Sequence, residues 1–139
     1  MKCVILAGGK GTRLSEETQE VPKPMIEIGD RPILWHIMKH YSAHGSDEFI
    51  ICTGYKSNYI KNYFVNYKVN NSVIHVDIKD NIVEVDSNVK ENWKISIIDT
   101  GLETNTAGRI KKVAKYIPED VFLLTYGDGV GDVNIRKSI

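Results

Sequence analysis

The sequence predicts an α/β fold, in which a Rossmann-like, mostly parallel sheet is flanked by helices. Two observations predict it. Short, largely apolar runs have the composition of strands covered on both faces, and segments with helical periodicity lie between them. The apolar runs are residues 1–7, 48–54, 94–100 and 121–126. A chain of 139 residues is one domain or part of one.

The first helix is predicted over residues 32–44. Pro32 suits a first helical turn, and Gly45 suits the position just past a helix end. The face predicted to be buried carries Ile33, Leu34, Ile37, Met38 and Tyr41. Residues 57–69 have the pattern of a second amphipathic helix, rich in tyrosine and lysine.

The elements that follow are a hairpin and a third helix. Residues 73–79 alternate, with Ile74, Val76 and Ile78 on one side, and residues 82–86 can pair with them. The third helix is predicted over residues 107–117. Its inward face is expected to carry Ile110, Val113, Ala114 and Ile117.

The composition excludes several classes of protein. Lysine plus arginine and aspartate plus glutamate both number 18, and this balance argues against a general nucleic-acid binder. No apolar run is long enough to span a bilayer, and residues 1–7 have the pattern of a strand rather than of a signal peptide. Cys3 and Cys52 lie in strand-like runs, so we expect buried, reduced thiols in a cytoplasmic protein; a Cys3–Cys52 disulfide is the alternative.

Two loops directly follow apolar strands, at 8–13 and at 127–128. Ligands of parallel α/β sheets bind at the carboxyl ends of the strands. Glycines let backbone N–H groups approach a phosphate, and Arg13 is suited to pair with phosphate oxygens. Lys23, in the stiff proline-flanked segment 22–25, is placed to add a second positive charge. The alternative for the loop at 8–13 is a glycine-rich turn without a ligand. The alternative for Lys23 is an exposed surface lysine.

Two nucleotide-binding motifs fail on spacing. The Walker A spacing G-x-x-x-x-G-K-[ST] does not occur. The dinucleotide fingerprint G-x-G-x-x-G is matched only by Gly9 and Gly11, with Leu14 in place of the third glycine. Residues 15–19 also lead toward prolines rather than into a helix, so the sequence disfavours an NAD-dependent oxidoreductase.

The stretches LAGGKGTRL at 6–14 and PKPM at 22–25 together resemble the signature of the sugar-phosphate nucleotidyltransferases. Further stretches are similar to the glucose-1-phosphate cytidylyltransferase branch of that family. They are RPILWHIMKHYSAHG at 31–45, FIICTGYK at 49–56, IIDTG at 97–101, GRIKKVAKYI at 108–117 and TYGDGVGDV at 125–133. The resemblance implies the nucleotide-diphospho-sugar transferase fold. Residues 1–139 would be its nucleotide-binding part, incomplete at the C-terminus, and we expect a longer natural protein.

The reaction that the resemblance implies is Mg²⁺-dependent transfer of a cytidylyl group from CTP to α-D-glucose 1-phosphate, giving CDP-glucose and pyrophosphate. Such a reaction needs positioning and positive charge more than a general base, because the attacking phosphate is already largely dianionic. Arg13 would stabilise the leaving pyrophosphate, Lys23 would neutralise the α-phosphate, and Asp128 would bind Mg²⁺. The resemblance also implies a homo-oligomer when full length, no nucleic-acid or membrane partner, and a product that feeds surface polysaccharide biosynthesis.

The nucleotide site that the resemblance implies draws on several stretches of the chain. Its expected residues are Leu6, Ala7, Gly8, Gly9, Gly11, Thr12, Arg13, Lys23, Thr104, Arg109 and Asp128. The family pattern T-G-G-R is replaced here by residues 106–109 (T-A-G-R), and Ala107 would be strained if its φ had to be positive. The alternative for Arg109 is a solvated residue in the first turn of a helix, and the alternative for Asp128 is a turn residue without a metal. Asp132, four residues after Asp128, is a second candidate carboxylate.

Other interpretations stay open. The same chemistry could use UTP, dTTP or GTP, or the chain could bind a nucleotide without turnover. His36, His40 and His44 repeat every four residues, which we interpret as the edge of a helix rather than as a metal site. The tyrosines repeat in the same way, which favours core packing or a contact with another subunit; they are Tyr55, Tyr59, Tyr63 and Tyr67.

Overall fold

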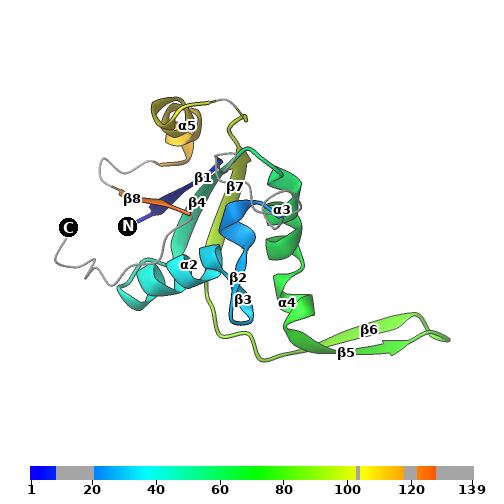
Figure 1. Cartoon of the computed structure of the whole chain (residues 1–139). Coiled ribbons are helices and arrows are strands. Elements are labelled where there is room, and N and C mark those ends of the chain that lie inside the picture. The colour runs from blue at the N-terminus through cyan, green and yellow to red at the C-terminus, as the bar shows by residue number, and fades with distance from the viewer. Residues whose placement is uncertain (9–20, 103, 118–121, 128–139) are drawn as a thin grey trace.

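A four-stranded parallel sheet forms the centre of the structure (Figure 1). The computed structural model describes residues 1–8, 21–102, 104–117 and 122–127. The strand order is β7-β4-β1-β8 and every neighbouring pair is parallel. The strands are β1 (Cys3–Ala7), β4 (Glu48–Thr53), β7 (Lys94–Asp99) and β8 (Leu123–Tyr126). The predicted α/β class is therefore confirmed.

Helices cover the sheet on both faces (Figure 1). On one face lie α2 (Ile33–Ala43) and α3 (Ser57–Val65), and α3 leads into the single turn α4 (Tyr67–Asn70). The other face is covered by α5 (Thr106–Val113), which runs into the 3₁₀ turn η2 (Ala114–Tyr116). The predicted helices over 32–44, 57–69 and 107–117 are found, although the second and third change geometry before their predicted ends.

Three small elements stand outside the sheet. The 3₁₀ turn η1 (Lys23–Met25) precedes the short antiparallel pair β2 (Glu27–Ile28) and β3 (Arg31–Pro32). The predicted hairpin is formed by β5 (Ser72–Asp77) and β6 (Ile82–Ser87), which pair in antiparallel register. It projects from the body of the molecule beyond α4 (Figure 1).

Successive side chains of a strand point to opposite faces of the sheet, so the core is divided into two layers. Cys3, Ile5 and Ala7 of β1 pack toward α2 and α3, in a cluster with Leu34, Ile37, Met38, Phe49, Ile51 and Ile60. The alternate residues Val4 and Leu6 pack on the other side, in a cluster with Ile50, Cys52 and Val113 of α5. Because β1 and β4 are central and covered on both faces, their side chains are buried along almost their whole length.

Three details differ from the sequence prediction. The run 121–126 was predicted as a buried strand, but Leu124 is 45% and Tyr126 61% exposed, because β8 lies at the edge of the described sheet. Ala114 is exposed rather than inward, because the α-helical period ends at Val113 and the chain tightens into η2. Ile78 lies in the turn between β5 and β6 and does not continue the strand.

Both cysteines are free and buried, as predicted. Burial raises the pKa of Cys3 to about 12 and that of Cys52 to about 11. A buried thiol with a raised pKa behaves as a small apolar side chain, so both contribute to the core. In the part of the chain that the structure describes, no helix has the length and apolar character needed to cross a membrane.

The central position of β1 leads to a test of the core. Val4 is fully buried and Val65, at the end of α3, is 80% exposed. Val4→Ala should lower the free energy of unfolding by about 2 kcal/mol, because two methyl groups lose their buried environment and leave a cavity. Val65→Ala should change it by less than about 0.5 kcal/mol. Urea unfolding followed by circular dichroism measures both; equal effects would contradict the two-layer core.

Candidate functional site

A glycine lies at or just beyond the carboxyl end of each strand of the sheet. Gly8 follows β1, Gly54 follows β4, Gly127 follows β8, and Gly101 lies two residues beyond β7. Because the strands are parallel, these glycines lie along one edge of the sheet. The backbone there is too close for side chains: a Cβ atom at Gly54 would lie 2.6 Å from the Gly101 carbonyl oxygen and 2.7 Å from that of Gly8.

Arg109 fills the centre of this edge. It comes from α5, is only 5% exposed, and passes so close to the chain that a Cβ atom at Gly8 would lie 1.8 Å from its Nη1. Gly8 therefore has no space for a side chain while Arg109 holds this position. The interpretation of Arg109 as a solvated first-turn residue is wrong.

The guanidinium group of Arg109 connects the loops at three strand ends. Nη1 donates to the Thr53 carbonyl oxygen at 3.3 Å and to Thr100 Oγ1 at 2.8 Å. Nη2 donates to the carbonyl oxygens of Gly8 at 3.2 Å and Leu102 at 3.3 Å. The planar fork thus satisfies acceptors at the ends of β4, β7 and β1 simultaneously, which the single ammonium group of a lysine could not do.

All four acceptors of Arg109 are neutral. Among the residues that the structure describes, no carboxylate forms an ion pair with it. Its positive charge acts on its surroundings: it partly offsets the effect of burial on the pKa of Cys52. A buried cation whose partners are all neutral leaves a positive field at the carboxyl edge, which favours a negatively charged ligand there.

A second cation lies beside Arg109 on the same helix. Lys112 Nζ donates to the Thr100 carbonyl oxygen at 2.8 Å and to Thr104 Oγ1 at 3.4 Å. The helix itself is fixed by Asn105, whose Oδ1 accepts the N–H of Gly108 at 2.8 Å. The structure therefore brings the predicted residues Thr104 and Arg109 to the same edge as the predicted residues 6–8.

Ala107 fits the structure without strain. It lies in the first turn of α5. The non-glycine residues with positive φ among those described are Lys56 and Asn81, so Ala107 is not one of them. The departure from the family pattern at this position therefore imposes no backbone penalty.

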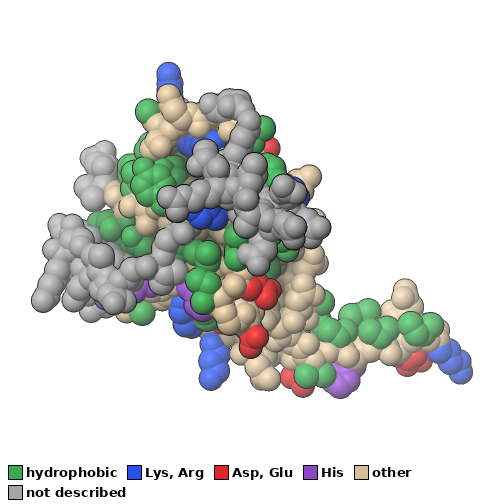
Figure 2. Space-filling view, in the orientation of Figure 1, with side chains coloured by type: hydrophobic (Ala, Val, Ile, Leu, Met, Phe, Trp, Pro, Cys, Tyr) green, Lys and Arg blue, Asp and Glu red, His purple; other side chains and the backbone are tan. Residues whose placement is uncertain are grey.

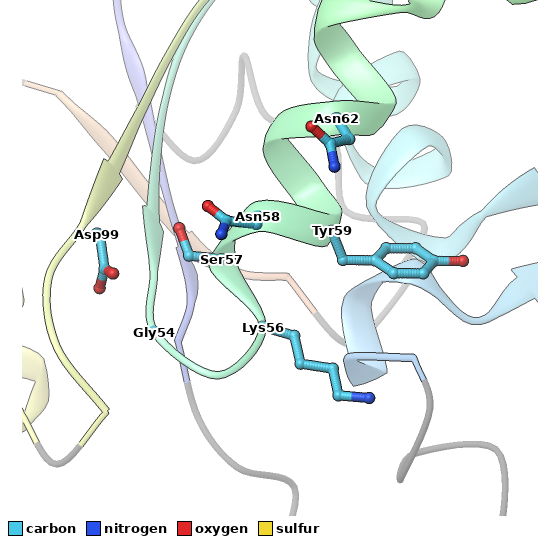
Figure 3. A pocket seen from close by; sticks show the side chains of 7 residues that line it. All are labelled: Gly54, Lys56, Ser57, Asn58, Tyr59, Asn62 and Asp99. Atoms are coloured by element: carbon cyan, nitrogen blue, oxygen red, sulfur yellow. The ribbon is translucent and has the colours of Figure 1, made fainter.

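A polar pocket of about 510 Å³ continues this edge on the α3 side (Figure 3). It is lined by Gly54, Lys56, Ser57, Asn58, Tyr59, Asn62 and Asp99. Ser57 lies 2.6 Å, Oγ to Oγ, from Thr53 at the end of β4, which fixes the start of α3 beside the sheet. Sequence reasoning missed this pocket; its one signal was Gly54-Tyr55-Lys56 directly after a strand.

The remaining predicted site residues lie partly outside and partly inside the described part of the chain. Gly9, Gly11, Thr12, Arg13, Asp128 and the possible second carboxylate Asp132 lie outside the described residues. Lys23 begins η1 and is half-buried, anchored by the buried Pro24 and Met25 that follow it. The N–H of Gly127 donates to the Leu6 carbonyl oxygen at 2.9 Å, so the residue before Asp128 lies against the end of β1.

Of the two repeats, the tyrosines reach this site only through Tyr59, which lines the pocket, and Tyr55, whose N–H donates to the Gly8 carbonyl oxygen at 3.4 Å. His36 Nε2 lies 2.8 Å from the Ile28 carbonyl oxygen, and no cluster of three or more potential metal ligands occurs among the described residues. Tyr63 and Tyr67 pack edge-to-face with ring centroids 5.7 Å apart, and Tyr67 donates a hydrogen bond to Glu91 at 2.7 Å. In the second half of the tyrosine repeat, Tyr63 therefore packs against the core and Tyr67 packs on Tyr63, while Tyr59 is exposed.

The four neutral acceptors of Arg109 lead to a stability test. Arg109→Met keeps the apolar stem but removes the hydrogen bonds that the guanidinium donates at three strand ends, so the free energy of unfolding should fall by about 2–3 kcal/mol. Lys111→Met, at an exposed position on the same helix, is the matched control and should have little effect. Chemical denaturation of the two variants measures the difference; equal stability would show that Arg109 does not hold the strand ends together.

The chain is similar in sequence to proteins whose activity is named. The chain is 54% identical to the glucose-1-phosphate cytidylyltransferase of Salmonella typhimurium, over 100% of the chain and 54% of that protein. It is 48% identical to a probable glucose-1-phosphate cytidylyltransferase of Bacillus subtilis, over 97% of the chain and 53% of that protein. The chain thus spans about half the length of these relatives.

Solved structures show the same fold. The crystal structure of HddC from Yersinia pseudotuberculosis matches 99% of this chain and 52% of its own, with a TM-score of 0.72 and 27% identity. A second HddC structure, in complex with GMP-PN, matches with a TM-score of 0.70 and 29% identity. The family model described as nucleotidyl transferase matches residues 2–139. The resemblance inferred from the two motifs is confirmed, and the chain belongs to the nucleotidyl transferase family.

Proposed function

We propose that the natural protein transfers a cytidylyl group from CTP to α-D-glucose 1-phosphate, with release of pyrophosphate, in the cytoplasm. The observation that carries the proposal is the hydrogen bond from Arg109 to the Gly8 carbonyl oxygen. It joins two stretches 101 positions apart, each of which the family resemblance implies to be part of the nucleotide site. The two cytidylyltransferases that match along the chain support the choice of substrates.

The nucleotide is proposed to lie along the glycine edge. Glycines at positions 8 and 54 let the strand ends pack closely around the guanidinium of Arg109, which places its charge at this edge. Thr104 and Arg109, with residues 6–8, would form the wall of the site nearest to α5. The charge of Arg109, which no described carboxylate neutralises, favours an anionic ligand at this edge.

Transfer of the nucleotidyl group is proposed to depend on positive charge. An oxygen of the sugar phosphate attacks the α-phosphorus of CTP, and the bond to pyrophosphate breaks. Lys23 would neutralise charge on the α-phosphate and Arg13 would stabilise the leaving pyrophosphate. The stiff segment around Lys23 suits such a role, because Pro24 and Met25 are buried and fix the position of its backbone.

Magnesium is proposed to be held by Asp128. Its neighbour Gly127 is bonded to Leu6, so the carboxylate follows in the chain directly after the edge where the triphosphate would lie. A carboxylate is the type of ligand that Mg²⁺ prefers, alongside phosphate oxygens. When bound, the ion would supply positive charge to the triphosphate.

A second candidate is the same chemistry with another nucleotide. HddC, a protein of this fold that is 29% identical to the chain, has been crystallised in complex with GMP-PN, which supports this candidate. A nucleotide-binding role without turnover is the third possibility. Comparing turnover of the protein with different nucleotides distinguishes the three possible functions.

The test measures pyrophosphate release by the natural protein with glucose 1-phosphate, Mg²⁺ and each of CTP, UTP, dTTP and GTP. We expect kcat/KM for CTP to exceed that for each other nucleotide at least tenfold, and EDTA to abolish turnover. Arg13→Ala should lower kcat at least 100-fold, about 2.7 kcal/mol in barrier, while the melting temperature is unchanged. Preference for another nucleotide would overturn the choice of CTP. Selective binding without pyrophosphate release would favour the third possibility.

A further inference from the structure

Two cations of α5 each donate a hydrogen bond to a threonine hydroxyl group at the carboxyl edge of the sheet. Figure 2 shows lysine and arginine side chains over this helix. Arg109 Nη1 donates to Thr100 Oγ1 at 2.8 Å, and Thr100 Oγ1 in turn donates to the Thr53 carbonyl oxygen at 2.9 Å. Lys112 Nζ donates to Thr104 Oγ1 at 3.4 Å. Arginine and lysine side chains can only donate, so each threonine oxygen accepts from its cation and keeps its own proton to donate.

The first of these two hydrogen-bond chains ends on an acceptor, and the second does not. The proton of Thr100 goes to the backbone at the end of β4. Among the residues that the structure describes, no acceptor is found for the hydroxyl proton of Thr104, whose side chain is half-buried. Donors in such positions are normally satisfied by the protein, by water or by a ligand. A ligand at this edge can therefore supply the acceptor for Thr104.

Close packing fixes the orientation of the Thr104 side chain. Its methyl carbon Cγ2 lies over Gly108, where a Cβ atom would come within 2.8 Å of it. Its Oγ1 lies against Gly101, which has a φ of +98° and where a Cβ atom would come within 2.6 Å. Lys112 is held in turn by the hydrogen bond from its Nζ to the Thr100 carbonyl oxygen at 2.8 Å. Because both branches of the threonine are placed, its oxygen stays beside the ammonium group.

The strand order separates Thr104 from the proposed phosphate site. Arg13 and Asp128, which are proposed to hold the triphosphate and its metal, follow β1 and β8 in the chain, and these two strands are neighbours. Thr104 follows β7, which lies two strands from β1 in the order β7-β4-β1-β8, a distance of about 10 Å at the usual spacing of strands. A nucleotide whose phosphates lie beyond β1 and β8 therefore brings its base, rather than its phosphates, to Thr104.

We propose that Lys112 is a positioning residue that holds the hydroxyl group of Thr104 as a hydrogen-bond donor to cytosine, an inference that rests on the proposed function. The acceptor is ring atom N3, which has a lone pair in cytosine and carries a hydrogen in uracil. Because Lys112 donates to its oxygen, Thr104 is turned to donate outward and is poorly placed to accept the N3–H group of uracil. The contact thus favours CTP over UTP, and Lys112 acts through Thr104.

The test measures the affinity of the natural protein for CTP and for UTP, each with Mg²⁺, by titration calorimetry. Lys112→Met frees the hydroxyl group of Thr104 to turn, so the ratio of the two affinities should fall at least fivefold toward equality. A general loss of positive charge would weaken both nucleotides alike and leave this ratio unchanged. Lys111→Met, at the neighbouring exposed position of α5, is the matched control and should keep the wild-type ratio.

A second variant separates a contact with the base from a change in the fold. Thr104→Val keeps the shape but removes the hydroxyl proton, so the dissociation constant for CTP should rise at least tenfold while that for UTP changes less than threefold. Adding Lys112→Met to Thr104→Val should leave the ratio where Thr104→Val put it, because Lys112 acts through Thr104. Circular dichroism checks that each variant is folded.

Three results would overturn the inference. Equal affinity of the wild-type protein for CTP and UTP would contradict the proposed choice of CTP as well. A preference for CTP that survives Lys112→Met would contradict the role of Lys112 and leave the proposed function intact. A further fall in the ratio when Lys112→Met is added to Thr104→Val would show that Lys112 acts on the nucleotide independently of Thr104.

Discussion

The buried guanidinium of Arg109 is the interaction on which the carboxyl edge of the sheet depends. Parallel strands bring their loops to one edge but do not by themselves fix how the loops pack. Here one side chain bonds to acceptors after β1, β4 and β7. Gly8 and Gly54 are needed because the backbone and this guanidinium lie too close together for any Cβ atom.

Burying the charge of Arg109 costs free energy, and the carboxyl edge of the sheet supplies the acceptors that offset this cost. A buried charge without an ionic partner is unfavourable unless its hydrogen bonds are satisfied, and in Arg109 four neutral acceptors do this. The remaining positive field is available to a ligand at the edge. The same edge receives Thr104, Lys112 and the end of β8, so the structural and the proposed binding roles of Arg109 coincide.

Much of the fold follows from local sequence patterns. Continuous apolar runs predicted β1 and β4 because both are covered on two faces. Pro32 directly precedes α2, and Gly45 lies two residues beyond its last residue, so both ends of the helix were predicted closely. The exposure of β8 was missed, because an apolar run does not reveal whether a strand is central or at an edge. The break after Val113 and the turn at Ile78 depend on hydrogen bonds between a few residues, which periodicity does not encode.

The candidate site was less accessible from the sequence. Glycine-rich loops after strands indicated the correct edge, and the motif resemblance added Thr104 and Arg109. The burial of Arg109 could not be predicted, because an arginine in a first helical turn is usually solvated and its acceptors lie up to 101 positions away. The pocket beside Gly54 was missed for a related reason: its lining comes from α3 and β7, which meet only in the folded chain.

The most direct test of the account follows the glycines during nucleotide binding. In protein labelled with ¹⁵N-glycine, addition of Mg²⁺ and CTP should shift the amide resonances of Gly8 and Gly54, which lie against Arg109, and of Gly101, whose carbonyl oxygen lies beside Gly54. Gly45, beyond the end of α2 at the opposite end of β4, should not move. Saturating nucleotide that leaves the three edge glycines unchanged, or that shifts Gly45 as much, would contradict the placement of the site.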